Sequence, residues 1–136
     1  MTLEEAIKQK KFDTEFEKLI VNILYTSGWV STQNADLLKP YKISGQQYNI
    51  LRILRGQHPY PATVNLLIDR MLDKMSNASR LVEKLRQKGL VERKECAADR
   101  RQVDVFITDK GLELLKEMDL KNKQFIEQNK TLSLEE

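Results

Sequence analysis

The chain has 136 residues, of which 40% are hydrophobic, and a net charge of +3, which is enough for one domain with a modest core. No apolar run approaches the roughly 18 residues of a membrane span, and the first residues lack a signal peptide's apolar segment, so we expect a cytoplasmic protein without membrane association. A single cysteine and a single histidine exclude an internal disulfide and a clustered metal site, and no phosphate-binding glycine loop or nucleophile elbow occurs. We therefore expect no cofactor, no metal and no enzymatic activity.

Both ends of the chain carry apolar residues at helical spacing. Near the N-terminus these are Ile7, Phe12, Phe16, Leu19, Ile20, Ile23 and Leu24. Near the C-terminus they are Leu112, Leu115, Met118 and Phe125. Two long helices flanking a compact module cannot both bury such stripes within so short a chain. The pattern therefore predicts a partner molecule, with a self-contained helical bundle as the alternative.

A helix with a sharp start is predicted over about 44–56. Ser44 and Gln47 have the spacing of a capping box, in which the two side chains satisfy backbone amides at the first turn. Gly56 and Pro59 are expected to end this helix, because glycine favours helix ends and proline cannot continue a helix.

The next segments predict a helix-turn-helix. Residues 63–71 form its first helix, and residues 72–75 its turn, without the glycine often found there. The second helix is expected to start with Ser76 as N-cap and to end at Gly89 in a Schellman motif with Leu90. Its apolar stripe consists of Ala78, Leu81, Val82 and Leu85. The opposite face is mostly small or basic, as on a helix that enters the major groove, although an ordinary solvated face is the alternative.

A charged hairpin follows that helix. Residues 91–95 and 102–108 predict two strands, the second with clean alternation of apolar and polar residues. The loop between them carries Arg100 and Arg101, and arginine is the side chain that a narrow minor groove attracts most. Asp99 is placed to orient the Arg101 guanidinium through a charge-assisted hydrogen bond, whereas the alternative is a merely solubilising pair. The order of elements predicts a winged helix-turn-helix that binds DNA.

Positive charge is concentrated on the same part of the chain. Residues 70–101 contain ten lysines and arginines against five acidic residues, whereas residues 1–69 contain eight against seven and residues 102–136 five against eight. Contacts with phosphates require such a local excess, because cations that neutralise the DNA backbone release condensed counterions. The charge distribution therefore supports a nucleic-acid partner.

Four short motifs together resemble the MarR family, the multiple-antibiotic-resistance regulators. They are Asp99-Arg100-Arg101, Thr108-Asp109-Lys110-Gly111, Arg80-Leu81-Val82 and Lys88-Gly89-Leu90-Val91. The resemblance covers residues 61–111, and outside them it extends only to the expected long terminal helices. It implies a mainly α fold with a small β-hairpin wing, that is, a winged helix-turn-helix with long N- and C-terminal dimerisation helices.

The resemblance also implies a homodimeric transcription regulator, commonly a repressor, on a pseudo-palindromic operator in double-stranded DNA. Residues 1–136 would form a single domain, with dimerisation helices at 1–40 and 109–136 and a DNA-binding lobe at 44–108. The expected DNA contacts are Ser76, Asn77, Ser79, Arg80, Lys84, Asp99, Arg100 and Arg101.

In the family that the chain resembles, a small ligand or oxidation commonly alters the affinity for DNA. The resemblance suggests an effector cleft lined by Tyr25, Trp29 and Tyr48 for a small aromatic or phenolic molecule, with plain core packing as the alternative. A redox role of Cys96 is disfavoured, because the chain has no second cysteine as a resolving partner.

A second class of function is a winged-helix protein-interaction module whose basic tip meets an acidic partner. A salt titration with random duplex separates the two classes, since a protein that binds DNA keeps a weak affinity that falls log-linearly with salt.

Overall fold

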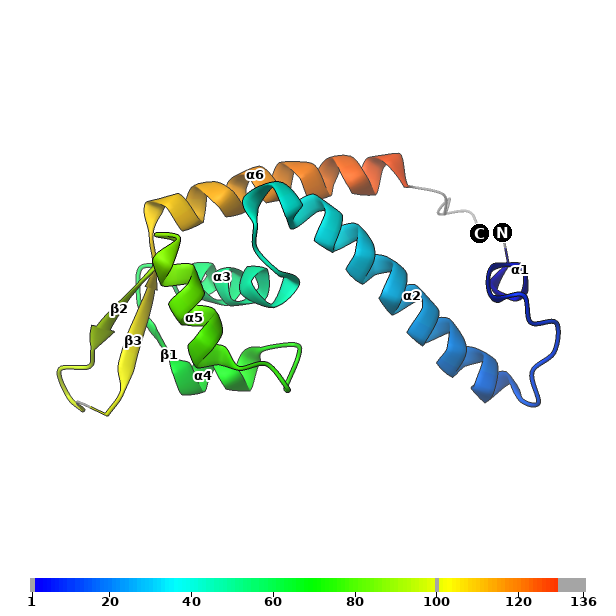
Figure 1. Cartoon of the computed structure of the whole chain (residues 1–136), viewed down its shortest axis with the longest axis horizontal. Coiled ribbons are helices and arrows are strands. Elements are labelled where there is room, and N and C mark those ends of the chain that lie inside the picture. The colour runs from blue at the N-terminus through cyan, green and yellow to red at the C-terminus, as the bar shows by residue number, and fades with distance from the viewer. Residues whose placement is uncertain (1, 100, 130–136) are drawn as a thin grey trace. The chain divides into compact units, whose positions relative to one another are not determined.

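The computed structural model describes residues 2–99 and 101–129 and confirms the predicted fold, which is mostly helical with a small antiparallel sheet (Figure 1). The helices are α1 (Leu3–Ile7), α2 (Glu15–Leu38), the 3-10 helix η1 (Lys39–Tyr41), α3 (Gly45–Gln57), α4 (Val64–Arg70), α5 (Ala78–Gln87) and α6 (Asp109–Gln128). The strands are β1 (Ala62–Thr63), β2 (Val91–Glu95) and β3 (Val103–Ile107). The chain divides into two compact units, Met1–Asp36 and Leu37–Glu136, and we call the second unit the lobe.

The first unit contains α1 and most of α2. The N-terminal apolar stripe is not one continuous helix, because Lys8 adopts the left-handed conformation (φ 56°) and ends α1 after Ile7. The start of α2 is fixed locally: Thr14 Oγ1 accepts the Glu17 amide at 3.0 Å, and the Glu17 carboxylate accepts the Asp13 amide at 2.9 Å. These side chains occupy amides that the first turn of a helix leaves without partners.

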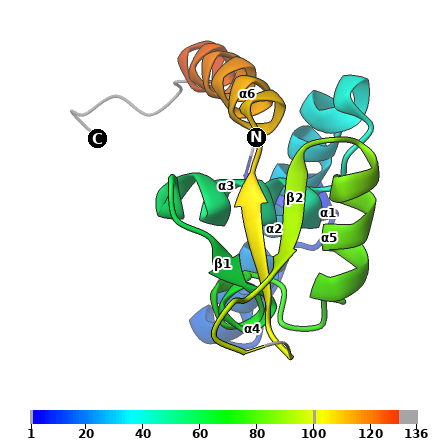
Figure 2. The ribbon, with the colours of Figure 1, turned by 90° about the vertical axis from the view of Figure 1, so that its left-hand side faces the viewer.

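The lobe is built around a three-stranded antiparallel sheet with the strand order β1-β3-β2. Figure 2 shows β3 between the other two strands, with helices around the sheet. The most completely buried large side chains of the lobe come from α2's last turn, α3, α4, α5, the sheet and α6, namely Leu38, Ile50, Leu51, Leu54, Leu67, Val82, Leu85, Val91, Val105, Leu115 and Met118. Sequence reasoning missed β1, because a strand of two residues shows no alternation to detect.

Helix α3 begins as predicted and ends later than predicted. Ser44 Oγ accepts the Gln47 amide at 3.1 Å and Gln47 Oε1 accepts the Ser44 amide at 2.8 Å, which confirms the capping box. The helix continues through Gly56 to Gln57, with His58 as its C-cap directly before Pro59, so its end was predicted to within one residue although Gly56 lies inside the helix. A glycine inside a helix costs only about 1 kcal/mol, and the buried residues of α3 outweigh this cost.

Helix α6 corrects part of the prediction that the apolar residues of both terminal helices need a partner molecule. Its Leu115 and Met118 are fully buried in the lobe's core, and the helix packs on α3. The prediction that this stripe needs a partner molecule was therefore wrong for the first half of α6, because the sequence does not show that α3 offers a complementary face. The exposed apolar residues of α6 are Leu120 and Ile126, towards its C-terminal end.

Candidate nucleic-acid interface

Helix α5 starts one residue later than predicted. Asn77 is the N-cap, and its Oδ1 accepts the Arg80 amide at 3.1 Å. Ser76 was the predicted N-cap, but its hydroxyl is buried instead. Serine and asparagine are about equally good N-caps, so composition alone did not decide between two neighbours. The buried Ser76 hydroxyl is not presented to a ligand, whereas Asn77 is exposed.

The exposed face of α5 carries two cations that are free of ion pairs within the described residues, Arg80 and Lys84. Ser79 is exposed beside them. Together with Arg101 of the wing, we call these four residues the basic surface. Unpaired exposed cations can neutralise phosphates without first breaking a protein contact.

Two other arginines near α5 are already engaged. The Glu83 carboxylate lies 2.7 Å from Arg86 Nη2 and 3.2 Å from Arg93 Nη2, so one acidic side chain joins α5 to strand β2. The hydrogen bond from Arg86 lowers the pKa of Glu83 below its usual range, with smaller contributions from the charges of Arg86 and Arg93. Glu83 therefore stays ionised at neutral pH, and both arginines remain held to it.

The end of α5 confirms the predicted Schellman motif. Gly89 has φ +73°, the Leu90 amide donates to Leu85 O at 3.0 Å, and the Gly89 amide donates to Arg86 O at 2.9 Å. Only glycine adopts this left-handed conformation without strain. The chain therefore leaves the helix in one fixed direction, into β2.

The Thr108–Gly111 motif joins the exit of α5 to the start of α6. Thr108 Oγ1 accepts the Gly111 amide at 3.2 Å and donates to Gly89 O at 2.7 Å. The Thr108 amide donates to Leu90 O at 3.1 Å. A Cβ on Gly111 would lie 2.5 Å from Leu90 O and 2.7 Å from Ile107 Cγ1, so no side chain fits there. The motif therefore couples the second helix of the helix-turn-helix to the wing and to α6.

The turn between α4 and α5 is held by a carboxylate in place of a glycine. Asp73 accepts the Met75 amide at 2.9 Å through Oδ1 and Gln46 Nε2 at 2.6 Å through Oδ2. The Leu72 amide donates to Asn49 Oδ1 at 3.0 Å. The hydrogen bond from the Met75 amide, followed by that from Gln46, lowers the pKa of Asp73 below its usual range. Sequence reasoning missed Gln46 and Asn49, because their partners are far away along the chain.

In the wing, Asp99 acts on the backbone of the loop. Its Oδ1 accepts the Arg101 amide at 2.9 Å, and its carbonyl accepts the Gln102 amide at 3.0 Å. Within the described part of the chain, Asp99 has no ion pair with the Arg101 guanidinium, so the predicted orientation of that side chain was wrong. An amide two residues on is simply nearer to an aspartate than the end of a long side chain. Arg100, the other predicted wing contact, lies outside the described residues.

The structure brings the second helix and the wing together. Ser79 of α5 and Arg101 of the wing line one small hollow, together with Thr63 and Asn65 at the start of α4. The N-terminal end of α5 and the tip of the wing lie at the same end of the lobe in both views (Figures 1 and 2). Asn65 was not predicted as a residue of this site. The sequence signal that could have indicated it is a polar residue in the otherwise apolar start of α4, where it is exposed.

The aromatic residues predicted for an effector cleft belong to different units. Tyr48 of α3 is buried in the lobe, and its hydroxyl accepts a hydrogen bond from Asn122 Nδ2 at 3.1 Å. Tyr25 and Trp29 lie on α2 and are 42% and 43% exposed. Tyr48 is therefore part of the core, which was the alternative to a role in an effector cleft. Arg52 lies over the Tyr48 ring, 5.8 Å from its centroid.

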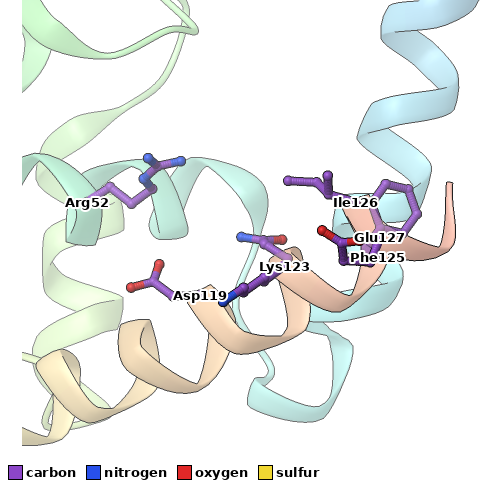
Figure 3. Close-up of a pocket in the computed structure, with 7 residues that line it drawn as sticks. Arg52, Asp119, Lys123, Phe125, Ile126 and Glu127 are labelled. Carbon is purple, nitrogen blue, oxygen red and sulfur yellow. The ribbon is translucent and has the colours of Figure 1, made fainter. Parts of the chain in front are cut away.

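A groove of about 430 Å³ lies between α3 and the C-terminal half of α6 (Figure 3), beside Tyr48 because two of its lining residues, Arg52 and Asn122, contact that side chain. It is lined by Arg52, Asp119, Asn122, Lys123, Phe125, Ile126 and Glu127. Asp119 is already paired with Arg55 at 2.6 Å, so Arg52 and Lys123 are the cations that this groove offers to an anion. Sequence reasoning missed the groove, because its walls come from helices far apart in the sequence.

Among the described residues, no three metal-ligating side chains gather into a possible metal site. None of the described helices combines the length and the apolar character needed to cross a membrane.

Comparisons with known proteins agree with this geometry. The model of the MarR family matches residues 41–102. The HTH-type transcriptional regulator PecS of Dickeya dadantii is 29% identical over 76 residues, which are 55% of this chain and 46% of PecS. The chain thus matches about half of the length of that regulator.

Two solved structures extend the match to most of the chain. A MarR transcription factor from Planctomyces limnophilus is 30% identical, with a TM-score of 0.73 over 87% of this chain and 85% of its own. A MarR-like transcription regulator from Bacillus cereus shares the fold, with 23% identity and a TM-score of 0.79 over 87% of this chain and 84% of its own. With its winged lobe and these matches, the chain belongs to the MarR family of transcription regulators.

Proposed function

We propose that the protein is a homodimeric regulator that recognises a pseudo-palindromic operator in double-stranded DNA. The observation that carries the proposal is the basic surface, in which Arg80 and Lys84 are exposed on α5 and Arg101 on the wing, with Ser79 and Arg101 lining one hollow. In this proposal Arg80 contacts a base edge in the major groove, and Arg101 enters the minor groove. Ser79 and Lys84 contact phosphates or bases beside them, and Arg100 contacts phosphate.

We propose different roles for three other predicted contacts. Asn77 is exposed and caps α5 through its Oδ1, so in this proposal it contacts DNA beside Arg80, and Asp99 acts by accepting the Arg101 amide in the wing loop. Ser76 is left out of the proposed contacts because its hydroxyl is buried.

The proposed dimer rests on the exposed apolar side chains of α2. Those more than 40% exposed are Phe16, Leu19, Ile20, Ile23, Leu24, Tyr25, Trp29 and Val30. By helical spacing, six of them share one face of α2, namely Phe16, Leu19, Ile20, Ile23, Leu24 and Val30, whereas Tyr25 and Trp29 lie on the opposite side. This six-residue apolar face is the proposed dimer surface, because an exposed apolar patch marks an interaction surface. A second copy of the chain is the proposed occupant, since two-fold pairing would set two copies of α5 for successive major grooves. We propose repression as the outcome, because a dimer on its operator occludes the DNA beneath it.

Selection of bound duplexes from a random pool, followed by sizing of the complex, tests this proposal. The expected result is an enriched site with two inverted halves, about one helical turn apart, bound by two chains. The competing protein-interaction module predicts no enriched sequence, and no weak binding of random duplex at low salt. That pair of results would overturn the proposal.

Replacing Arg80 by alanine is expected to weaken binding of the selected operator about 10- to 100-fold, since a bidentate contact to a base contributes roughly 1–3 kcal/mol. Random duplex should lose much less affinity, because only a general cation is removed. Fluorescence anisotropy over a range of salt concentrations measures both affinities. The matched control is Lys116→Ala, which removes an exposed cation from α6. Equal losses on operator and random duplex would show that Arg80 does not read sequence.

We also propose that a small aromatic or phenolic acid regulates DNA binding. The groove beside Tyr48 supports this, since its apolar residues Phe125 and Ile126 suit a ring, and Arg52 and Lys123 suit a carboxylate. The effector cleft first predicted from Tyr25, Trp29 and Tyr48 stays a prediction.

With salicylate as the probe, Lys123→Ala is expected to raise about tenfold the concentration that releases the operator, because one charge-assisted contact is lost. Lys121→Ala is the control, since Lys121 lies over the Tyr41 ring at 4.6 Å and does not line the groove. Operator release is followed by anisotropy. The same salicylate response in both variants and in the unaltered protein would place the effector site elsewhere.

A further inference from the structure

The turn between α4 and α5 carries the two most exposed large apolar side chains among the described residues. Met75 is 92% exposed and Leu72 is 88% exposed. Both lie in a short segment that otherwise carries polar or charged residues, Asp73, Lys74 and Ser76. Covering such exposed apolar side chains with a partner is favourable, because apolar surface is then removed from water.

These side chains stand on a turn with a defined backbone. The Asp73 carboxylate holds the Met75 amide at 2.9 Å and is itself held by Gln46 at 2.6 Å. Asn49 holds the Leu72 amide at 3.0 Å. Lys74 Nζ donates to Asp69 O, which closes the turn back onto α4. The turn therefore presents Met75 from a fixed position, and little backbone entropy is lost when a partner binds it.

Met75 is also placed next to the proposed DNA contacts. Only Ser76 separates it from the N-cap Asn77, and Arg80 follows in the first turn of α5. The N-terminal end of a recognition helix is the part that approaches base edges in the major groove. Met75 thus continues the proposed interface along the chain, two residues before the N-cap of α5.

Two apolar side chains are too few to form a stable protein interface, which covers about 800 Å² on each partner. In the major groove, by contrast, the C5-methyl group of thymine is a single apolar group that proteins contact directly. Methionine suits such a contact, because its side chain is unbranched, flexible and polarisable. The basic surface beside Met75 also favours a partner with negative charge.

We propose that Met75 reads a thymine methyl group at one position of each half-site, an inference that rests on the proposed DNA-binding function. Met75 would thereby set part of the sequence preference. Leu72 lies three residues before Met75, and so further from the N-cap Asn77, and contributes no such reading.

The experiment replaces each thymine of the selected operator by uracil, which removes only the methyl group, and measures the affinity of three proteins. The protein itself should lose about fourfold in affinity at one thymine of each half-site, the effect of one buried methyl group. Met75→Gln should bind thymine and uracil operators equally at that position, and Leu72→Gln should keep the fourfold difference. Because both residues are exposed, both variants should fold normally, as circular dichroism would check.

Two outcomes overturn the inference in different ways. If Met75→Gln keeps the same preference for thymine over uracil, or if no thymine shows a preference, the protein binds DNA but Met75 does not read a methyl group. If the random pool yields no operator at all, the proposed function itself fails, and this inference fails with it.

Discussion

Replacing Ile23 by glutamate is expected to convert the protein into monomers at concentrations at which the unaltered protein is a dimer. Ile23 is 55% exposed on α2 and lies near the middle of the six-residue apolar face that we propose as the dimer surface. Burying an unpaired carboxylate in an apolar interface costs several kcal/mol. The dissociation constant of the dimer should therefore rise at least about 100-fold. Sedimentation equilibrium measures it directly.

The same variant should lose operator binding far more than binding of a single half-site, because two linked contacts become one. Thr32→Glu is the matched control. Thr32 is exposed on α2, nine residues or two and a half turns after Ile23, and so on the opposite side of the helix. A dimer that survives Ile23→Glu unchanged would remove this face from the interface, and a Thr32→Glu monomer would place the interface on the other side.

Local signals in the sequence predicted the parts of the lobe that are built locally. The capping box of Ser44 and Gln47, and the Schellman stop at Gly89, each satisfy backbone groups within a few residues of themselves. The hairpin strands followed from the alternation in 103–107, which needs only one buried face. Such features depend on short-range geometry, and the structure has them within one or two residues of the predicted positions.

The errors have a common physical origin in contacts between distant segments. Asn49 and Gln46 of α3 hold the turn at Leu72 and Asp73, so that a turn without glycine is stable. Leu115 was expected to need a partner molecule, but it is buried in the lobe's core, where α6 packs on α3. The neighbouring sequence of these residues does not indicate which distant residues they contact.

For the candidate DNA contacts too, the sequence predicted the local features but not the contacts between distant residues. The sequence predicted which residues face outward on α5, because helical spacing separates Ser79, Arg80 and Lys84 from the buried stripe. It could not show that Glu83 engages Arg86 and Arg93, nor that the Asp99 carboxylate meets a backbone amide. The folded lobe therefore decides which cations remain free to contact DNA. Of the many lysines and arginines in this part of the sequence, only a few side chains remain as candidates.

Replacing Gly111 by alanine is expected to reduce the free energy of unfolding by about 1–3 kcal/mol, the usual cost of forcing extra atoms into a packed site. The added Cβ would lie 2.5 Å from Leu90 O, which accepts the Thr108 amide, and 2.7 Å from Ile107 Cγ1. Neither neighbour is the free end of a flexible side chain, so the junction itself must shift. Urea unfolding followed by circular dichroism measures the change.

The chain offers a control of the opposite sign. Gly56 lies inside α3, and a Cβ added there would meet nothing within 4 Å. Gly56→Ala should therefore raise the free energy of unfolding by up to about 1 kcal/mol, because alanine favours the helix. Since the Gly111 junction also holds the exit of α5, Gly111→Ala should weaken operator binding even where it is fully folded, whereas Gly56→Ala should not. Unchanged stability and operator affinity in Gly111→Ala would mean that the Thr108–Gly111 motif neither packs tightly nor fixes α5 for DNA.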